Sequence, residues 1–178
     1  METAGATKYV VLGMLTFGAK TGYDIKGIVE RSTRFFWAAS YGQIYPELNR
    51  LEQAGLIAGT DAPRGARPRK EYELTDAGRA DLLEWLRTPP QMPELRDESL
   101  LKLFFSDQLP LEEALGQLRM RRMGHEQFLA ILREIDARPG DDTPFVDLVL
   151  RYGIAYAEFN VAWCERYEAE LRERAAVA

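Results

Sequence analysis

The sequence predicts a mainly α-helical protein in two parts, on the basis of three observations. Residues 87–93 contain three prolines within five positions, which cannot continue a helix. Before this segment, helical patterns alternate with two short strand patterns. After it, every segment has helical periodicity. We therefore expect two domains, at residues 1–88 and 89–178.

Two helices are expected first in the chain. Residues 8–17 are largely apolar, which indicates a buried helix. Residues 21–33 form the second helix, where Thr21 and Asp24 have the spacing of a capping box, a hydroxyl followed three positions later by a carboxylate.

A third helix is expected over residues 40–54, with Gly55 as its C-terminal stop. At 100° per residue, Ile44, Leu48 and Leu51 fall on one stripe, which would pack against the first two helices.

The opposite face of this third helix has the chemistry of a DNA-reading surface. Small residues let a backbone approach a groove, and amides and guanidiniums pair with base edges and phosphates. By angle we expect Tyr41 to be more buried than Tyr45. Pro46 leaves open whether the helix begins nearer Gly42 or is kinked at the proline. The outward residues are Gly42, Pro46, Asn49, Arg50 and Gln53, flanked by Gln43 and Tyr45.

Two short strands and a fourth helix complete the first domain. Residues 56–60 and 70–74 are the strands, the second with alternating polar and apolar residues. Residues 61–69 would form the hairpin between them, and Thr75 would cap a helix that runs to about Arg87. Three helices, a two-stranded wing and a fourth helix make up the order of a winged helix-turn-helix.

The hairpin tip is strongly basic. Arg64, Arg67, Arg69 and Lys70 place four cations within seven residues, without an acidic residue among them. Arginines at a turn reach the minor groove or the phosphates beside the major groove. The net charge of −5 does not oppose this, because residues 91–178 carry 17 acidic against 11 basic residues, while residues 1–90 carry 11 against 12.

Two motifs resemble the PadR family of bacterial transcription regulators. Residues 40–57 read SYGQIYPELNRLEQAGLI, similar to the family pattern G-x-I/L-Y-P-x-L-x-R-L-E-x-x-G-L-I. Residues 69–78 read RKEYELTDAG, similar to R-K-x-Y-x-L-T-x-x-G, and residues 22–25 are also family-like. The resemblance covers about the first 85 residues.

The resemblance implies a homodimer that binds inverted-repeat operators on double-stranded DNA, usually as a repressor. It implies that Tyr41, Gln43 and Tyr45 lie at the DNA surface and that Arg67 and Arg69 lie in the wing. Some family members also bind small aromatic effectors. The complete DNA-binding set that we predict is Ser40, Tyr41, Gly42, Gln43, Tyr45, Asn49, Arg50, Arg64, Arg67, Arg69 and Lys70.

The second half predicts a helical dimerisation domain. A short helix is expected at residues 99–105, a longer one from Pro110 to about Arg138, and a last one at residues 144–175. The last helix, about 45 Å long, carries an aromatic stripe too long for a small domain to cover alone, which favours packing against a second subunit. A ligand pocket is the competing interpretation. The predicted interface residues are Phe145, Leu148, Tyr152, Tyr156, Phe159, Trp163 and Tyr167.

Other classes of protein fit less well. We expect no catalytic site, metal site or cofactor. His125 is the only histidine and Cys164 the only cysteine, and no phosphate-binding glycine loop is present. No signal peptide or membrane span is expected, which favours the cytoplasm. His125 is expected at the surface, and Cys164 as a partly buried apolar residue. A winged-helix module that binds only protein stays open as the alternative.

Overall fold

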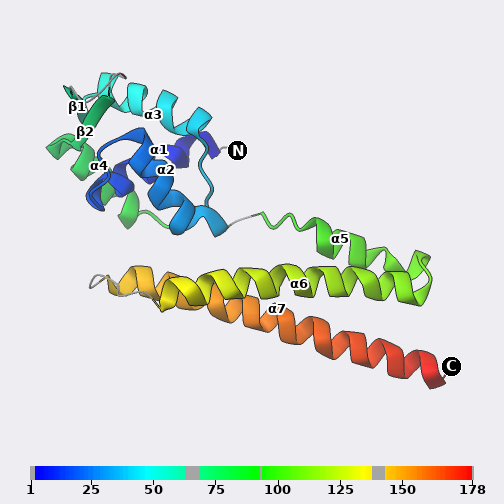
Figure 1. Ribbon diagram of the computed structural model, residues 1–178. Helices are drawn as coiled ribbons and strands as arrows, with labels where there is room; N and C mark the ends of the chain where they lie inside the picture. Colours follow the sequence, from blue (N-terminus) through cyan, green and yellow to red (C-terminus); the bar gives the residue numbers. More distant parts are fainter. Residues whose placement is uncertain (1–2, 63–68, 93, 138–142, 178) are drawn as a thin grey trace. The chain divides into compact units, whose positions relative to one another are not determined.

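The structure, a computed structural model, describes residues 3–62, 69–92, 94–137 and 143–177. The chain divides into two compact units, Met1–Met92 and Pro93–Ala178 (Figure 1). The described residues are mainly helical, and their one sheet has two antiparallel strands. No described helix combines the length and apolar character needed to cross a membrane.

The first unit has the element order that the sequence predicts. Its first helix begins earlier than expected, because residues 3–7 are small or hydroxylated and give no apolar periodicity. The elements are α1 (Thr3–Thr16), α2 (Gly22–Arg31), a 3-10 turn (Thr33–Phe35), α3 (Tyr41–Gln53), β1 (Ile57–Ala62), β2 (Arg69–Leu74) and α4 (Asp76–Arg87).

Helix α2 begins with the predicted capping box. The Thr21 hydroxyl accepts a hydrogen bond from the Asp24 backbone N–H (3.1 Å), and the Asp24 carboxylate accepts one from the Thr21 N–H (3.0 Å). These bonds satisfy N–H groups that no helical carbonyl reaches. The start of α2 is therefore fixed locally by its sequence.

The core of the first unit lies where α1, α2 and α3 meet. Ile44, Leu48 and Leu51 of α3 are buried in it, as their spacing predicts. Helix α4 packs on α1, where the rings of Tyr9 and Trp85 stack with centroids 4.3 Å apart. The outward face of α3 is thus held on a packed helical base.

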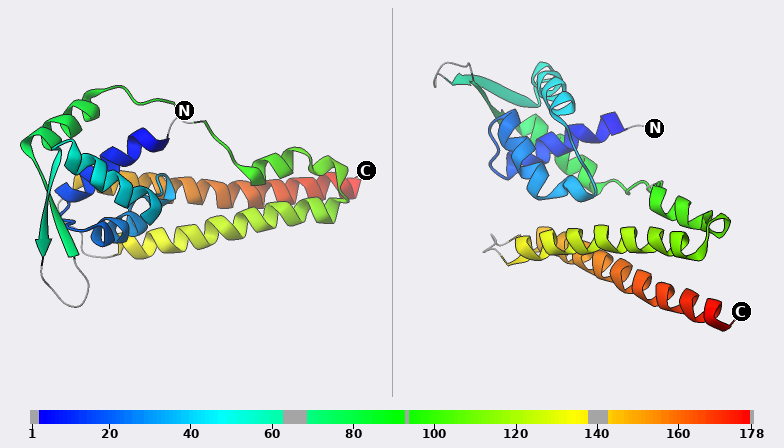
Figure 2. Two further views of the ribbon diagram at one scale, coloured as in Figure 1. Left: turned by 90° about the horizontal axis from the view of Figure 1, so that it is seen from above. Right: turned by 45° about the vertical axis from the view of Figure 1, so that its right-hand side comes forward.

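The two strands form a hairpin beside α3 (Figure 2). Ile57 pairs with Leu74 at its base and Asp61 with Lys70 further out. The backbone N–H of Tyr72 also donates to the carbonyl of Lys20 (2.7 Å), so β2 is tied to the loop between α1 and α2. This hairpin is the predicted wing.

Gly78 allows the start of α4 to pack on the turn after α3. A Cβ there would overlap the carbonyl oxygen of Leu56 and lie 2.9 Å from its carbonyl carbon. The replacement Gly78→Ala should lower the free energy of unfolding by about 2 kcal/mol, because backbone atoms must shift. Urea denaturation of the variant and the wild type measures this difference in the free energy of unfolding. Gly13→Ala is the control, since nothing lies within 4 Å of its Cβ position. Equal stability of the two variants would contradict this packing.

The second unit is a helical hairpin preceded by a short helix. Helices α6 and α7 lie side by side and antiparallel, as ion pairs at both ends show (Figures 1 and 2). Its elements are α5 (Glu98–Phe104), a 3-10 turn (Ser106–Gln108), α6 (Leu111–Asp136) and α7 (Pro144–Val177).

The hairpin has a thin apolar core. Leu115 and Leu118 of α6 are buried against Cys164 of α7, and Trp163 packs on this cluster. Further along, Leu132 packs against Gly153, where a Cβ would lie 3.1 Å from its methyl group.

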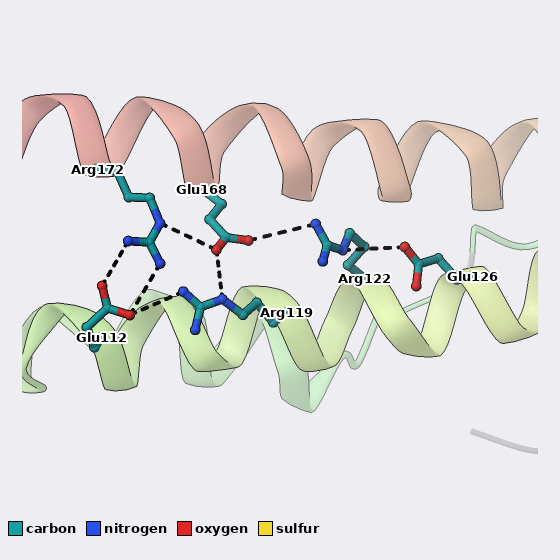
Figure 3. A network of polar contacts seen from close by, with 6 residues as sticks. All are labelled: Glu112, Arg119, Arg122, Glu126, Glu168 and Arg172. Carbon is teal, nitrogen blue, oxygen red and sulfur yellow. Dashed lines mark hydrogen bonds and ion pairs between the residues drawn. The ribbon is translucent and has the colours of Figure 1, made fainter.

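A row of ion pairs fixes the register of α6 against α7 (Figure 3). The Glu168 carboxylate lies 2.7 Å from Arg119 Nε, 3.6 Å from Arg172 Nε and 3.9 Å from Arg122 Nη1. The hydrogen bond from Arg119 lowers the pKa of Glu168 more than its partial burial raises it. Glu112 completes the row by bridging Arg119 and Arg172. The network orders the hairpin along one side.

Candidate nucleic-acid interface

Helix α3 presents a polar face to solvent. The predicted outward residues Gly42, Gln43, Asn49 and Arg50 are all exposed, as is Ser40 at the N-cap. Because the apolar stripe on the other side is packed into the core, this face cannot turn inward. The structure therefore brings together the predicted helix residues on one surface.

The start of α3 is settled by its cap. The helix begins at Tyr41, and the Gln43 side-chain oxygen accepts hydrogen bonds from the Ser40 N–H (2.9 Å) and hydroxyl (3.0 Å). Pro46 lies inside the helix and has no N–H to donate to the carbonyl of Gly42. The Gln43 amide thus has a structural task in the free protein, while its NH₂ group takes no part in these two bonds.

Both tyrosines of α3 are exposed, Tyr41 by 43% and Tyr45 by 47%. Tyr41 is the less exposed of the two, as expected, but only by this small margin: Tyr41 is the first helical residue, and its ring lies along that of Tyr45, with centroids 6.0 Å apart. Tyr45 also covers Gly22 at the start of α2, where a Cβ would lie 2.8 Å from the ring. The two hydroxyls are therefore carried by a positioned aromatic pair.

Arg50 forms an ion pair with Glu47, a buried glutamate of the same helix. Its Nη1 lies 2.7 Å from Glu47 Oε2, and the Glu47 side chain is almost fully covered while the arginine remains exposed. The burial of Glu47 leaves Arg50 as the exposed member of the pair on the outward surface.

A lysine that the sequence did not single out holds the segment before α3. Lys26 of α2 forms an ion pair with Glu30 and donates a hydrogen bond to the carbonyl of Ala39 (3.0 Å). Ala39 directly precedes the N-cap of α3. Periodicity marks Lys26 only as a polar position, because its partner lies thirteen residues away and is a backbone atom.

The wing residues are only partly described. Arg64 and Arg67 lie outside the described residues. Arg69 is the first residue of β2, opposite Ala62. Lys70 lies next to it, and its amine forms an ion pair with Glu52 of α3 (2.7 Å). The base of the wing is thus bonded to the helix that it accompanies.

The predicted interface residues of α7 fall into two groups. Phe145, Tyr152 and Phe159 are 81%, 72% and 64% exposed, and Leu148 and Tyr156 are also exposed. Trp163 and Tyr167 are instead half-buried; Trp163 packs inside its own subunit and Tyr167 touches it, with ring centroids 5.1 Å apart. The stripe is therefore continuous in sequence, but its first part is exposed while Trp163 and Tyr167 are partly covered.

A buried polar cluster joins α5, α6 and α7. Arg121 is buried; its Nη1 donates to Asp97 Oδ2 and its Nη2 to Asn160 Oδ1, both at 2.7 Å. Burial raises the pKa of Asp97, but hydrogen bonds from Ser99, Arg121 and Leu100 outweigh it and set the pKa at about 2. Sequence patterns do not reveal this cluster, since its members are 24 and 39 residues from Arg121.

His125 lies at the edge of this cluster and is half-buried, contrary to the expected surface position. Its ring meets that of Tyr156 edge-on, with centroids 5.6 Å apart. Burial lowers the pKa of the His125 imidazole, and the positive charge of Arg121 lowers it further. Cys164 is fully buried, and burial raises the pKa of its thiol. Within the described residues, no three of His, Cys, Asp and Glu are grouped so that they would hold a metal.

Comparison with known proteins covers both halves of the chain. Residues 11–84 match the transcriptional regulator PadR-like family, and residues 95–172 match the C-terminal model of virulence activator alpha. The chain is 38% identical over 109 residues to the negative transcriptional regulator PadR of Bacillus subtilis (strain 168); this alignment spans 60% of this chain and only 60% of that regulator.

Solved structures resemble the chain over nearly its whole length. The crystal structure of Bacillus subtilis PadR in complex with operator DNA has a TM-score of 0.84 and 31% identity, covering 92% of this chain and 98% of that one. Its complex with p-coumaric acid has a TM-score of 0.78 and 29% identity, covering 97% and 98%. The winged-helix fold and the family resemblance are confirmed, and the chain belongs to the PadR-like family of transcriptional regulators.

Proposed function

We propose that this protein is a homodimeric transcription regulator that binds operator DNA through α3 and the wing, and that it acts as a repressor. The observation that carries the proposal is the outward face of α3, which is polar, exposed and fixed on a packed core. The likeness to a family member bound to operator DNA supports the same assignment. The role is binding in the cytoplasm, without a catalytic step.

Some residues of α3 contact DNA bases, and others contact the sugar-phosphate backbone of the DNA. The Asn49 amide and the Arg50 guanidinium supply the donors and acceptors that base edges in the major groove recognise. The hydroxyls of Tyr41 and Tyr45 suit phosphate oxygens, while their rings pack on sugars. Gly42 lets the backbone at the start of the helix approach the groove closely. These roles require the outward face of α3 to lie along the groove from Gly42 to Arg50.

The wing supplies charge and no base specificity. Arg64, Arg67 and Arg69 would neutralise phosphates beside the groove that α3 occupies. Each neutralised phosphate releases counterions, so that affinity falls steeply with salt concentration. Binding by this surface is therefore both specific, through α3, and strongly salt-dependent, through the wing.

The exposed part of the α7 stripe is proposed as the dimer interface. Aromatic side chains exposed over several helical turns are costly in water, and a second copy of the same stripe would cover them. A two-fold axis would also place two α3 helices about 34 Å apart, one turn of DNA, as an inverted repeat requires. The dimer thus links the second unit to operator recognition.

Replacing Phe159 by aspartate is expected to weaken the dimer at least about 30-fold, since a buried aromatic anchor contributes about 2 kcal/mol or more. Sedimentation equilibrium measures the dissociation constant, and circular dichroism checks folding. Ala169→Asp on another face of α7, also exposed, is the control. An unchanged dissociation constant for the Phe159 variant would exclude this interface.

We further propose that a small aromatic acid releases the protein from DNA, as the p-coumaric acid complex of the relative suggests. The melting temperature with a panel of aromatic acids tests this part separately. A compound that raises the melting temperature and also weakens DNA binding supports it. The absence of any such compound would remove the effector and leave DNA binding unaffected.

The test of the proposed function is a binding titration with the DNA upstream of the protein's own gene. Fluorescence anisotropy at several salt concentrations should give saturable binding, a steep decrease in affinity with salt, and resistance to scrambled competitor DNA. A reporter gene behind the same DNA should be expressed more strongly when the protein is deleted. Absence of binding even at low salt would favour the alternative, a module that binds only protein.

A further inference from the structure

Lys70, the last of the four cations of the wing, is already bonded within the protein. Its Nζ lies 2.7 Å from Glu52 Oε1 and donates a hydrogen bond to Oε2 at 2.8 Å. Glu52 is in the last turn of α3 and Lys70 is the second residue of β2. The ion pair therefore connects the helix that would read DNA with the strand that leads into the wing.

Gly59 of β1 makes the space for this pair. A Cβ at position 59 would overlap the Lys70 side chain at Cε and lie 2.5 Å from Glu52 Oε1. Gly59 is opposite Tyr72 in the hairpin and has no left-handed backbone conformation. Its lack of a side chain thus serves the close approach of the two charged groups and not a turn.

The energetics of the pair favour a positioning role. Both side chains are partly exposed, 39% for Lys70 and 29% for Glu52, so that water screens the pair and it adds little to stability. The hydrogen bond that Lys70 donates to Glu52 raises the pKa of Lys70 more than burial lowers it, so the amine stays charged and bonded. A phosphate would have to compete with this carboxylate for the amine.

We propose that Lys70 and Glu52 form a strut that sets the wing at a fixed angle to α3, and that Lys70 is a positioning residue and not a phosphate ligand. This inference rests on the proposed function, since it assigns the strut a role in DNA affinity. Glu52, an acid near the DNA surface, then assists DNA binding, although its charge alone would oppose it.

The sign of the effect of Glu52→Gln separates the two roles of Lys70. If the strut matters, Glu52→Gln and Lys70→Gln each lower operator affinity about fivefold, and the double variant is no worse than either. The slope of log affinity against log salt concentration stays unchanged in both. If Lys70 binds a phosphate, Glu52→Gln raises the affinity, and Lys70→Gln lowers the slope by about one. This second result would overturn the proposal.

Two further variants control for charge and folding. Glu73→Gln removes one carboxylate from the exposed side of the same hairpin and should leave affinity equal or slightly higher. Gly59→Ala changes no charge but displaces the pair, and should reproduce the loss seen with Glu52→Gln. Wild-type affinity in Gly59→Ala would count against the strut. Circular dichroism confirms that each variant is folded.

A measurement without DNA distinguishes failure of the strut from failure of the proposed function. Hydrogen exchange of the backbone amides in β1 and β2 should be faster in Glu52→Gln than in Glu73→Gln, because the strut no longer restrains the hairpin. Equal exchange rates refute the strut, whether or not the protein binds DNA. Faster exchange in a protein that does not bind operator DNA would retain the strut and reject the function.

Discussion

Replacing Arg67 and Arg69 together by alanine is expected to lower operator affinity about 100-fold at physiological salt. Each arginine is proposed to neutralise one phosphate, and a hydrogen bond to a charged group contributes about 1.5–3 kcal/mol. The slope of log affinity against log salt concentration should decrease by about two, since each contact contributes about 0.9. Fluorescence anisotropy over a range of salt concentrations measures both quantities.

The control for this experiment removes two arginines from the second unit. Arg96 and Arg174 are exposed, and within the described ranges Arg96 pairs with the exposed Glu94 and Arg174 with the partly exposed Glu170, so that their loss changes net charge equally without affecting packing. The Arg96→Ala/Arg174→Ala variant should bind nearly as well as the wild type. Loss of affinity in the control but not in the wing variant would show that the DNA-binding surface lies elsewhere.

Replacing Arg121 by methionine is expected to lower the free energy of unfolding by about 3 kcal/mol. Methionine keeps the apolar stem but leaves the Asp97 carboxylate and the Asn160 amide without their charged partner, and breaking a buried ion pair is strongly destabilising. Urea unfolding at pH 7 measures the difference. Arg122→Met on the same helix is the control, because its ion pairs are partly exposed and should cost less than about 1 kcal/mol.

The same cluster gives this stability a defined pH dependence. The pKa of Asp97 is about 2 in the folded protein, below its ordinary value of 3.8. A lowered carboxyl pKa stabilises the fold above the unfolded pKa, by about 2 kcal/mol here, and this contribution is lost as the pH falls from about 4 towards 2. The stability difference between wild type and Asp97→Asn should therefore shrink over that range. A difference that stays constant between pH 7 and pH 2 would contradict the role of the charged pair.

The sequence predicted those parts of the fold that depend on local patterns. The capping residues Thr21 and Thr75 mark the helix starts that the structure has. The stripe of Ile44, Leu48 and Leu51 located the buried side of α3, and hence its outward face. Such features follow from helix geometry and from the bonding needs of helix ends, which a few neighbouring residues determine.

Features that depend on contacts between distant segments were not predictable in this way. Arg121 is an ordinary charged residue in sequence, and only the fold brings Asp97 and Asn160 to it. The Glu52–Lys70 bond likewise joins two elements that periodicity treats separately. Trp163 belongs to the aromatic stripe by spacing, yet it is covered within its own subunit because α6 packs on that part of α7.

The central claim is that the outward face of α3 and the wing bind DNA together, and NMR spectroscopy tests it most directly. On addition of the operator duplex, backbone amide signals of residues 40–50 and of the wing should shift most, with smaller changes in α6. Large shifts confined to other surfaces, with the signals of α3 and the wing unmoved in the bound protein, would contradict it.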